Sequence, residues 1–422
     1  MKKNLNIGLI GFGTVGQGVY ELLKKNSPLI KNRKGINLKI RTICDLKTAR
    51  VKKFAKNVKV TDKWKDIVND PEIDLIVELI GGINPAKEII STSLRLGKKV
   101  VTANKKLLAE KGEEIFEILK ASESFLGFEA SVGGGMPCLL SLEDGLVGNK
   151  IKSITGILNG TTNYILSQME DNPEASFAEI LREAQKKGFA ELDPTFDIEG
   201  FDAGHKITLL AMLAYNLKID FKAIPVEGIT KIDQLDISHA EEMGYKIKLL
   251  GIATYHNNKL DARVHPTMIP KQHPLAAVRD EFNAIMFDGD MTDPILIYGK
   301  GAGSFPTASA VVSDLVRATL YENKPSVKKK ASFLPSTKRF SKYYLRIKTK
   351  DSPGILAKIA GVLGSYDISI ASVLQKQTGQ KYVPIIIMTH QAIESKMLKA
   401  IDKIKKLSFV NKDIVFIRVE DF

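Results

Sequence analysis

Over the first part of the chain, short apolar runs alternate with longer segments whose apolar residues fall at helical spacing. The first run, Leu5 to Ile10, is followed by apolar positions from Val15 to Leu23 that repeat with the period of a helix. Runs from Leu38 to Cys44 and from Ile73 to Ile80 continue the alternation, and the second is apolar almost throughout, as a parallel strand buried on both faces requires. The pattern predicts an α/β domain built on a parallel sheet.

Several details of this region depart from the simple alternation. Ser27 to Asn37 is expected to be a loop inserted before the second strand. Further strands are expected from Lys99 and from Phe125 to Val132. Gly133 to Pro137 follows as a flexible loop at the edge of the sheet, or as a hinge to the next domain.

The pattern changes in the middle of the chain. Ile151 to Leu158 is strand-like and Tyr164 to Met169 is helix-like. From Ile224 to Ile297 several strand-like runs alternate with one or two helices, which predicts a mostly antiparallel sheet. Gly299 to Thr307 is a second glycine-rich turn, and Ala308 to Leu320 is expected to be a helix that returns to the first domain.

The end of the chain is predicted to be a separate module. After a basic segment from Lys324 to Lys342 that is typical of an exposed linker, strands and helices alternate in the order βαββαβ of a ferredoxin-like domain. The strands are expected at Tyr343–Lys348, Ile368–Gln375, Val383–Thr389 and Asp413–Val419, and the helices at Ile355–Leu363 and Glu394–Ile404.

Composition narrows the class of protein. With 422 residues, of which 44% are hydrophobic and 26% charged, the chain has the make-up of a globular protein of two or three domains. A net charge of +14 would favour binding to a polyanion such as a nucleic acid. The lysines are scattered, however, and the densest group is in the linker, so no nucleic-acid partner is expected. The sequence contains no run of about eighteen apolar residues, so no membrane-spanning helix is expected. The presence of only Cys44 and Cys138 favours a reducing, cytoplasmic location.

A glycine-rich turn joins the first strand to the first helix, and its residues are Gly11, Phe12, Gly13, Thr14, Val15 and Gly16. In this context Gly11 permits a tight turn, Gly13 lets the backbone approach a pyrophosphate, and Gly16 lets the helix pack on the strand. Because phosphates bind at helix N-termini, the turn predicts a dinucleotide-binding domain. A purely structural glycine turn is the alternative.

The end of the second strand bears on the choice of cofactor. Asp45 could bind the ribose 2′-hydroxyl of NAD and would repel the 2′-phosphate of NADP. Lys47 and Arg50 would have the opposite effect. These residues therefore leave both NAD and NADP open.

The most unusual polar stretch runs from Glu191 to Lys206 and places several carboxylates before one lysine. If a helix begins near Phe201, Asp202 and Lys206 lie four residues apart on one face of a buried helix, where an acid and a base converge. The alternative is a solvated loop with a surface ion pair, which contributes little. The other acids of the stretch are interpreted as structural: Asp193, Asp197 and Glu199.

Two further polar groups are candidates for the same site. Lys105 follows a parallel strand at its carboxyl end, the edge where such sheets bind ligands, so it is expected to face the cofactor. The turn of Asn159, Gly160 and Thr161 precedes a helix. Its free amides can hold an anion such as a carboxylate, although the turn can equally be a well-capped helix start.

Together these motifs resemble homoserine dehydrogenase over residues 1 to about 320, and the last domain resembles an ACT regulatory module. The resemblance implies a reversible, nicotinamide-dependent conversion between L-aspartate 4-semialdehyde and L-homoserine, in the synthesis of threonine, methionine and isoleucine. The motifs that carry it are Gly11–Gly16, Thr102–Lys105, Ile157–Asn163, Glu191–Lys206, Gly301–Ala310 and, in the last domain, Asp351–Gly354.

The resemblance also implies how the chain is divided. A Rossmann-type dinucleotide-binding domain is expected at residues 1–135 and about 299–322, with an α+β domain for substrate binding, catalysis and dimerisation at residues 136–298. A linker at residues 323–341 and an ACT domain at residues 342–422 complete the chain.

Roles for single residues follow from the resemblance. Lys206 and Lys105 would serve the reacting oxygen, and Glu191 and Asp202 would hold the substrate or a water molecule. The substrate carboxylate would bind at Asn159, Gly160 and Thr161, and Gly303 would join the cofactor site. A monovalent cation, sodium or potassium, would be bound mainly by backbone oxygens of Glu129, Val132, Gly134 and Met136. An amino-acid effector would bind at Asp351, Pro353 and Gly354.

One departure from the family pattern is Cys44, which stands where much of the family has an arginine; this favours NAD over NADP. A homodimer or homotetramer is expected by analogy. The alternatives are another Rossmann-type oxidoreductase of amino-acid metabolism, or a catalytically inactive amino-acid sensor. The sensor would have a disrupted lysine or glycine motif, whereas both motifs are intact here.

Overall fold

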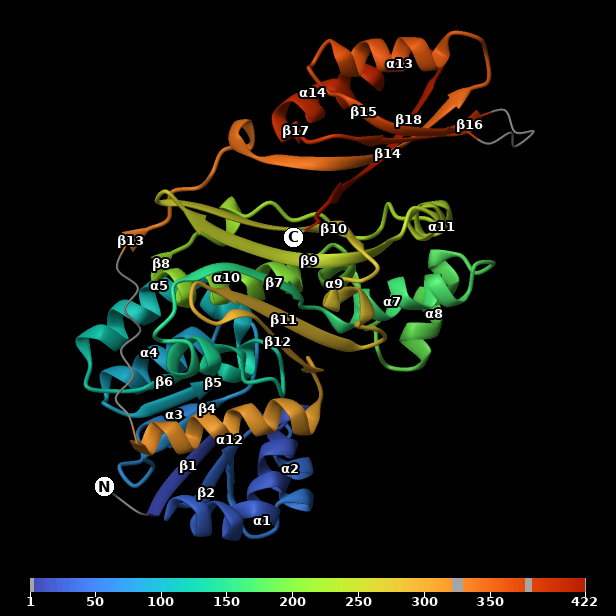
Figure 1. Cartoon of the computed structure of the whole chain (residues 1–422). Helices are drawn as coiled ribbons and strands as arrows, with labels where there is room; N and C mark the ends of the chain where they lie inside the picture. The colour runs from blue at the N-terminus through green and yellow to red at the C-terminus, as the bar shows by residue number, and fades with distance from the viewer. Residues whose placement is uncertain (1–3, 321–328, 376–381, 422) are drawn as a thin grey trace.

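The computed structural model describes residues 4–320, 329–375 and 382–421. The chain forms three successive layers, with the N-terminal domain at one end, the C-terminal domain at the other and a middle domain between them (Figure 1). Among the described residues, no helix is long and apolar enough to cross a membrane. Part of the expected linker, residues 323–328, lies outside the described residues.

The N-terminal domain is built on a six-stranded parallel sheet in the order β3-β2-β1-β4-β5-β6, which confirms the expected Rossmann-type fold. This order reverses between β1 and β4, so a crevice for a ligand is expected at the carboxyl ends of these strands. The strands are β1 (Asn4–Ile10), β2 (Asn37–Cys44), β3 (Lys59–Thr61), β4 (Leu75–Glu78), β5 (Lys99–Thr102) and β6 (Leu126–Gly127). The helices are α1 (Thr14–Lys34), α2 (Thr48–Phe54), α3 (Trp64–Val68), α4 (Ala86–Arg95), α5 (Lys105–Ala121) and α12 (Ser304–Leu320).

The helix α12 returns to the first domain from far along the chain, as predicted. The Ser304 hydroxyl donates to the Thr14 carbonyl at 2.8 Å, so the first turns of α12 and α1 lie side by side. Gly18 permits this approach, because a Cβ at that position would lie 2.6 Å from Ser304 Oγ.

Two predictions for this domain were wrong. Ser27 to Asn37 is not an inserted loop, because α1 continues through Pro28 to Lys34 and ends at Gly35, in the left-handed conformation with φ 68°. The Ser27 hydroxyl is satisfied inside the helix, where it donates to the Leu23 carbonyl, and Ile30 packs against the apolar core. A proline and a polar residue therefore did not end the helix.

The expected strand from Phe125 to Val132 is also shorter than predicted. Only Leu126 and Gly127 pair with β5, and Glu129–Ser131 forms a short 3₁₀ turn. The Glu129 amide donates to the Asp314 carboxylate at 2.8 Å, so a side chain of α12 takes the hydrogen bond that a neighbouring strand would have accepted.

The middle domain contains the expected antiparallel sheet, with strand order β12-β11-β7-β9-β10. Its strands are β7 (Ile151–Ile157), β9 (Tyr245–His256), β10 (Lys259–Pro270), β11 (Phe282–Gly289) and β12 (Asp293–Lys300). Its helices are α6 (Cys138–Leu140), α7 (Gly160–Asp171), α8 (Phe177–Lys186), α9 (Thr195–Ile198), α10 (Phe201–Tyr215) and α11 (Gln234–Glu242). A short strand, β8 (Leu217–Lys218), pairs with β13 (Lys329–Lys330).

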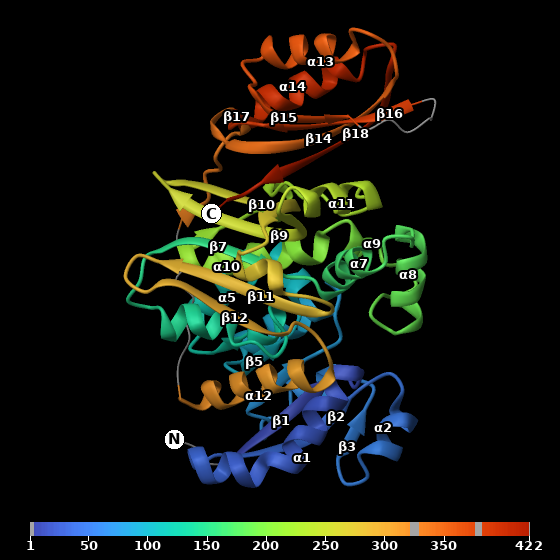
Figure 2. The same ribbon diagram turned by 45° about the vertical axis from the view of Figure 1, so that its right-hand side comes forward.

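The C-terminal domain has the predicted βαββαβ order, with one additional short strand. Figure 2 shows α13 and α14 on the side of their sheet that faces away from the middle domain. The elements are β14 (Phe340–Lys350), α13 (Ile355–Gly364), β15 (Ile370–Gln375), β16 (Tyr382–Thr389), β17 (Ala392–Ile393), α14 (Glu394–Ile404) and β18 (Val410–Val419).

This domain is less separate than the sequence predicted. β18 pairs in parallel with β10 at Thr267 and Met268, so the sheet of the middle domain continues into the C-terminal one. A buried ion pair strengthens the junction: Arg346 of β14 donates from Nε to Asp236 of α11 at 2.8 Å, and the Tyr344 hydroxyl donates to the same carboxylate at 2.9 Å. Arg346 and Asp236 are 1% and 0% exposed.

We predict that Arg346→Met strongly destabilises the protein. Removing one partner leaves the Asp236 charge buried without compensation, which costs about 3–5 kcal/mol of unfolding free energy. Urea unfolding followed by circular dichroism measures the change. Lys342→Met is the matched control, because the ion pair of Lys342 with Asp421 is partly exposed, at 38% and 42%, and is expected to contribute less than about 1 kcal/mol. Equal losses for the two variants would contradict the assignment.

Candidate active site

The glycine turn between β1 and α1 has the geometry of a phosphate seat. A Cβ at Gly11 would lie 2.7 Å from the Leu79 backbone, and one at Gly16 would lie 2.2 Å from the Gly11 carbonyl, so close packing requires both glycines. A Cβ at Gly13 would meet no described atom within 4 Å. Gly13 also offers no side-chain cap to α1, so no side chain of this residue takes the amides of the first turn. The residues present therefore fit a bound pyrophosphate.

Two neighbours of this turn were also expected at the cofactor site. Asp45 lies at the end of β2 and accepts the Phe12 amide at 2.8 Å and the Lys47 amide at 2.8 Å. The fingerprint backbone therefore fixes the position of this carboxylate. Gly303, with φ 121°, directly precedes α12, whose first turn lies against that of α1. Both residues border the phosphate seat.

At the centre of the candidate site, Asp202 lies between two lysines. Lys105 Nζ is 2.8 Å from Asp202 Oδ1, and Lys206 Nζ is 2.7 Å from Asp202 Oδ2. Lys206 also donates to the carbonyl of Leu158 at 2.6 Å. We refer to Lys105, Asp202 and Lys206 as the lysine–aspartate cluster. It is brought together from α5 of the first domain and α10 of the middle domain.

Burial sets the protonation of this cluster. Burial opposes ionisation of Asp202, but the Lys206 and Lys105 ammonium groups hold its pKa below the ordinary value. Burial lowers the pKa of Lys206, which is 6% exposed, and the second ammonium group acts in the same direction. The Asp202 charge raises the pKa of Lys105, whose side chain is 34% exposed. The two lysines therefore differ: Lys105 is held charged, whereas Lys206 loses its proton more readily than a free lysine.

The start of α7 forms the wall beside the cluster. Asn159 caps the helix by accepting the Thr162 amide at 2.8 Å, and its own amide nitrogen donates to Asp202 at 2.9 Å and to Asp197 at 2.7 Å. The Thr161 hydroxyl donates to the Phe189 carbonyl at 2.6 Å and lies 3.3 Å from Asp197. The turn is thus both a capped helix start and a neighbour of the cluster.

The structure places Asp197 beside the cluster and leaves Glu191 exposed. Asp197 was interpreted as structural, yet it lies against Asn159 and Thr161, and burial together with the Asp202 charge raises its pKa. Glu191 is exposed, and its charge acts on Lys105 from a distance. The spacing of the acids along the loop could not show which of them lies beside the cluster. The one local indication was that Asp197 lies one helical turn before α10, the helix that carries Asp202 and Lys206.

A buried hydrogen-bond network that the sequence analysis missed fixes the start of α5. Glu78, at the end of β4, accepts the Thr102 hydroxyl at 2.6 Å, and that hydroxyl accepts the Asn104 amide at 3.0 Å. Asn104 then caps α5 by accepting the Leu107 amide at 3.1 Å. Lys105 is the first residue of the helix and is positioned by this network. The sequence feature that could have indicated this network is Glu78, an acidic residue at the end of an otherwise apolar strand.

The residues expected to bind a cation surround a tight loop. The Glu129 carboxylate accepts the amides of Leu139 and Leu140, and burial raises its pKa to about 8. Gly134 has φ 56° and packs against the Gly301 backbone, where a Cβ would lie 2.6 Å from the carbonyl carbon. Within the described parts of the chain, no group of three or more acidic, histidine or cysteine side chains could hold a metal ion. Val132 and Met136, the other two residues of this prediction, are buried, at 0% and 3% exposed.

The residues expected to bind an effector lie far from the cluster in the chain. Asp351, Pro353 and Gly354 form an exposed turn before α13. Gly354 has φ 81°, and a Cβ there would meet open space. The first turn of α13 is therefore accessible to a ligand.

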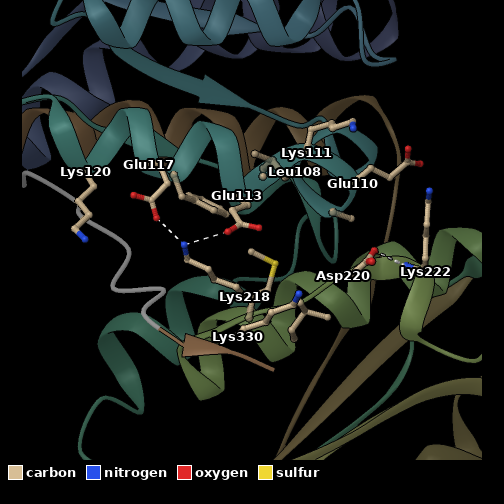
Figure 3. Close-up of a pocket in the computed structure, with 15 residues that line it drawn as sticks. Leu108, Glu110, Lys111, Glu113, Glu117, Lys120, Lys218, Asp220, Lys222 and Lys330 are labelled. Carbon is tan, nitrogen blue, oxygen red and sulfur yellow. Dashed lines mark hydrogen bonds and ion pairs between the residues drawn. The ribbon is translucent and has the colours of Figure 1, made fainter. Parts of the chain in front are cut away.

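A recess of about 340 Å³ lies along α5 but does not include the cluster. Figure 3 shows Lys218 reaching across it toward Glu113 and Glu117, at 3.1 and 2.7 Å. Its lining begins at Leu108 on α5, after the catalytic candidate Lys105, and none of the expected site residues contributes to it. Its charged groups are best described as a partly exposed ion-pair surface between the first and middle domains.

Family models identify all three parts of the chain. The model for homoserine dehydrogenase matches residues 137–316, that for the homoserine dehydrogenase NAD-binding domain matches residues 11–129, and that for the ACT domain matches residues 343–409. A curated homoserine dehydrogenase from Neisseria gonorrhoeae is 43% identical over 431 residues, which cover 99% of each chain.

Solved structures agree with these matches. The crystal structure of a homoserine dehydrogenase from Thiobacillus denitrificans has 41% identity and a TM-score of 0.94, with 99% of both chains covered. The structure of S. aureus homoserine dehydrogenase has 34% identity and a TM-score of 0.78, with 100% of both chains covered. The chain therefore belongs to the homoserine dehydrogenase family, NAD(P)-dependent oxidoreductases that act on a CH–OH group, and it carries a C-terminal ACT domain.

Proposed function

We propose that the lysine–aspartate cluster carries out the proton transfer in the interconversion of L-aspartate 4-semialdehyde and L-homoserine, with Lys206 as the acid and base. The observation that supports this most directly is the single buried carboxylate within 2.8 Å of both ammonium groups. Such an arrangement offers positive charge and a transferable proton at one point. Reduction of an aldehyde needs both, because it creates an alkoxide that must be stabilised and then protonated.

The two lysines have different tasks in this proposal. The nicotinamide cofactor supplies or takes up the hydride when it is bound. Lys206 donates a proton to the developing alkoxide during reduction, and neutral Lys206 accepts a proton from the hydroxyl group during oxidation. Lys105, whose pKa Asp202 raises, stays charged and stabilises the oxygen. Asp202 holds both side chains in position.

The charged ends of the substrate have complementary groups beside the cluster. The amides of Gly160 and Thr161 have no partner within α7, because they belong to its first turn, and they can bind the substrate carboxylate. Asp197 and Asp202 offer negative charge to its ammonium group. Glu191 is exposed here, so its role rests on the family resemblance alone.

We also propose that NAD is preferred over NADP. The Asp45 carboxylate is fixed beside the fingerprint turn by the amides of Phe12 and Lys47. A fixed negative charge at this edge would repel a 2′-phosphate. Cys44, the buried residue before Asp45, cannot supply the positive charge that would offset this repulsion.

A monovalent cation is proposed at the loop of Glu129, Val132, Gly134 and Met136. The Glu129 carboxylate accepts two amides, and its backbone oxygen accepts the Val132 amide at 3.2 Å. A carbonyl oxygen has a second lone pair, which is the one proposed to bind the cation. A cation there would stiffen the loop that packs on the Gly301 turn. It would therefore act on the cofactor side of the site by ordering the backbone.

Regulation and assembly complete the proposal. An end-product amino acid, threonine among the candidates, is proposed to bind at Asp351, Pro353 and Gly354.

A homodimer or homotetramer is supported by the edge strand β12, where the apolar side chains of Leu296 and Tyr298 are 38% and 54% exposed and could be covered by a second copy of the chain. A cytoplasmic location is consistent with free, buried Cys44 and Cys138.

We predict that Lys206→Ala lowers kcat by a factor of about 10²–10⁴, as expected for loss of a general acid, and leaves cofactor affinity nearly unchanged. Steady-state kinetics with homoserine, and cofactor fluorescence titration, measure the two quantities. Lys106→Ala is the control, because Lys106 is an exposed neighbour of Lys105. Near wild-type turnover of Lys206→Ala would refute the assignment.

In the wild type, the rate of homoserine oxidation should rise with pH as Lys206 loses its proton. This rise should occur at a lower pH than the pKa of a free lysine, because the pKa of Lys206 is lowered.

We predict that Asp45→Ser lowers the ratio of kcat/KM for NAD over NADP by about tenfold, equivalent to about 1.4 kcal/mol. The reason is that the variant removes the charge that repels a 2′-phosphate. Parallel kinetics with both cofactors test this in wild type and variant. A wild-type preference for NADP, or an unchanged ratio in Asp45→Ser, would exclude Asp45 as the discriminating residue.

We predict that Asp351→Ala weakens inhibition by the effector by about tenfold to a hundredfold, because a lost charge-assisted hydrogen bond is worth about 1.5–3 kcal/mol. Activity is titrated with threonine, methionine and isoleucine in turn. A point variant is preferable to removal of the C-terminal domain, since β18 pairs with β10. If wild type and Asp351→Ala respond alike, this turn is not the receptor.

A further inference from the structure

A short segment of the middle domain, residues 226–230, touches both the C-terminal domain and the turn that carries the site aspartates. We call this segment the strap. Figure 1 shows that it belongs to the region between α10 and α11, beneath the C-terminal domain. It is anchored to β10, because the Glu227 amide donates to the Val264 carbonyl at 2.8 Å and the Val264 amide donates to the Pro225 carbonyl at 2.9 Å. It is therefore a fixed element.

On one side, the strap holds the turn from Ile198 to Gly200. The Ile229 amide donates to the Ile198 carbonyl at 2.8 Å, and the Thr230 hydroxyl donates to Glu199 Oε1 at 3.1 Å. Gly228 is pressed against this turn, since a Cβ there would lie 2.2 Å from the Ile198 carbonyl oxygen. Each residue of the turn is thus fixed in position.

This turn sets the relative positions of Asp197 and Asp202. Asp197 lies in α9, directly before the turn, and Asp202 is the second residue of α10, directly after it. Gly200 has φ 84°, and a Cβ there would lie 3.1 Å from Val226 Cγ1, so the turn fits closely under the strap. A movement of the strap would therefore move one aspartate relative to the other.

On its other side, the strap is held by the C-terminal domain. Arg418 of β18 donates to Glu227 through both guanidinium branches, at 2.9 and 3.1 Å, and through Nε to Glu394 of α14 at 2.8 Å. Arg418 is only 5% exposed, whereas the Glu227 side chain is 38% exposed, so the pair is partly shielded from water. A two-pronged arginine–carboxylate contact of this kind is directional.

We infer that Glu227 is a positioning residue for the reaction: through Gly228 and Ile229 it fixes the Ile198–Gly200 turn, and thereby the geometry of Asp202 and its two lysines. The same contact gives the C-terminal domain a direct mechanical connection to the active site. The inference rests on the role proposed above for Asp202, which the Lys206→Ala experiment tests separately.

The test compares Glu227→Gln with Asp236→Asn in the full-length protein. Both are isosteric changes to a carboxylate that binds an arginine of the C-terminal domain, but Asp236 lies in α11, outside the strap. Because small misplacements of reacting groups can cost large factors in rate, Glu227→Gln should lower kcat about tenfold with cofactor affinity unchanged. Asp236→Asn should keep wild-type kcat below its melting temperature. Equal losses in both variants, or an unchanged kcat in Glu227→Gln, would overturn the inference.

Two further variants keep the test decisive if Glu227→Gln is poorly folded. Thr230→Val removes only the exposed hydrogen bond to Glu199 and should lower kcat in the same sense, by about twofold to threefold, the factor for about 0.5 kcal/mol of one hydrogen bond. Arg418→Lys keeps the charge but loses the two-pronged contact. If the effect passes through this pair, adding Arg418→Lys to Glu227→Gln should cause no further loss of kcat, whereas additive losses would show that the two side chains act independently.

Discussion

The structure depends on one costly arrangement, a carboxylate buried between two ammonium groups. Asp202 and Lys206 are almost completely shielded from water, and burial of unpaired charges would be prohibitively unfavourable. Each charge is therefore matched: Asp202 meets Lys105 and Lys206, and Lys206 also meets the Leu158 carbonyl. These partners come from both the nucleotide-binding and the middle domain, so the cluster exists only when the two domains are packed together.

The surrounding elements keep the partners of this cluster in register. Glu78 and Thr102 fix the start of α5 from the sheet below, and Asn159 ties the start of α7 to Asp202 and Asp197. The strap, which binds Arg418 of the C-terminal domain, holds the turn between Asp197 and Asp202. Hydrogen bonds from neighbouring groups hold the side chains of the cluster in position, and this makes the geometry of the site precise. It also means that a change at the ACT domain can reach the cluster through packed, hydrogen-bonded contacts.

The elements that were predicted well have local causes. The glycine fingerprint, most of the apolar strands and the βαββαβ order each depend on residues close in sequence, and the structure contains them. The errors have non-local causes. α1 continues past Pro28 because Ile30 still faces the core, and the strand expected at Phe125 is interrupted because Asp314, far along the chain, binds the Glu129 amide.

The sequence by itself determined the fold class, the nucleotide turn and the pairing of Asp202 with Lys206, because a four-residue spacing on a helix fixes which side chains share a face. Lys105 was expected at this site, but only the tertiary structure showed that it binds the same carboxylate as Lys206. The tertiary structure also decided that Asp197 rather than Glu191 lies beside the cluster, and that Glu227 connects it to the C-terminal domain. These contacts join residues tens to hundreds of positions apart. Their distances are set by how helices and sheets pack, and no local spacing in the sequence records them.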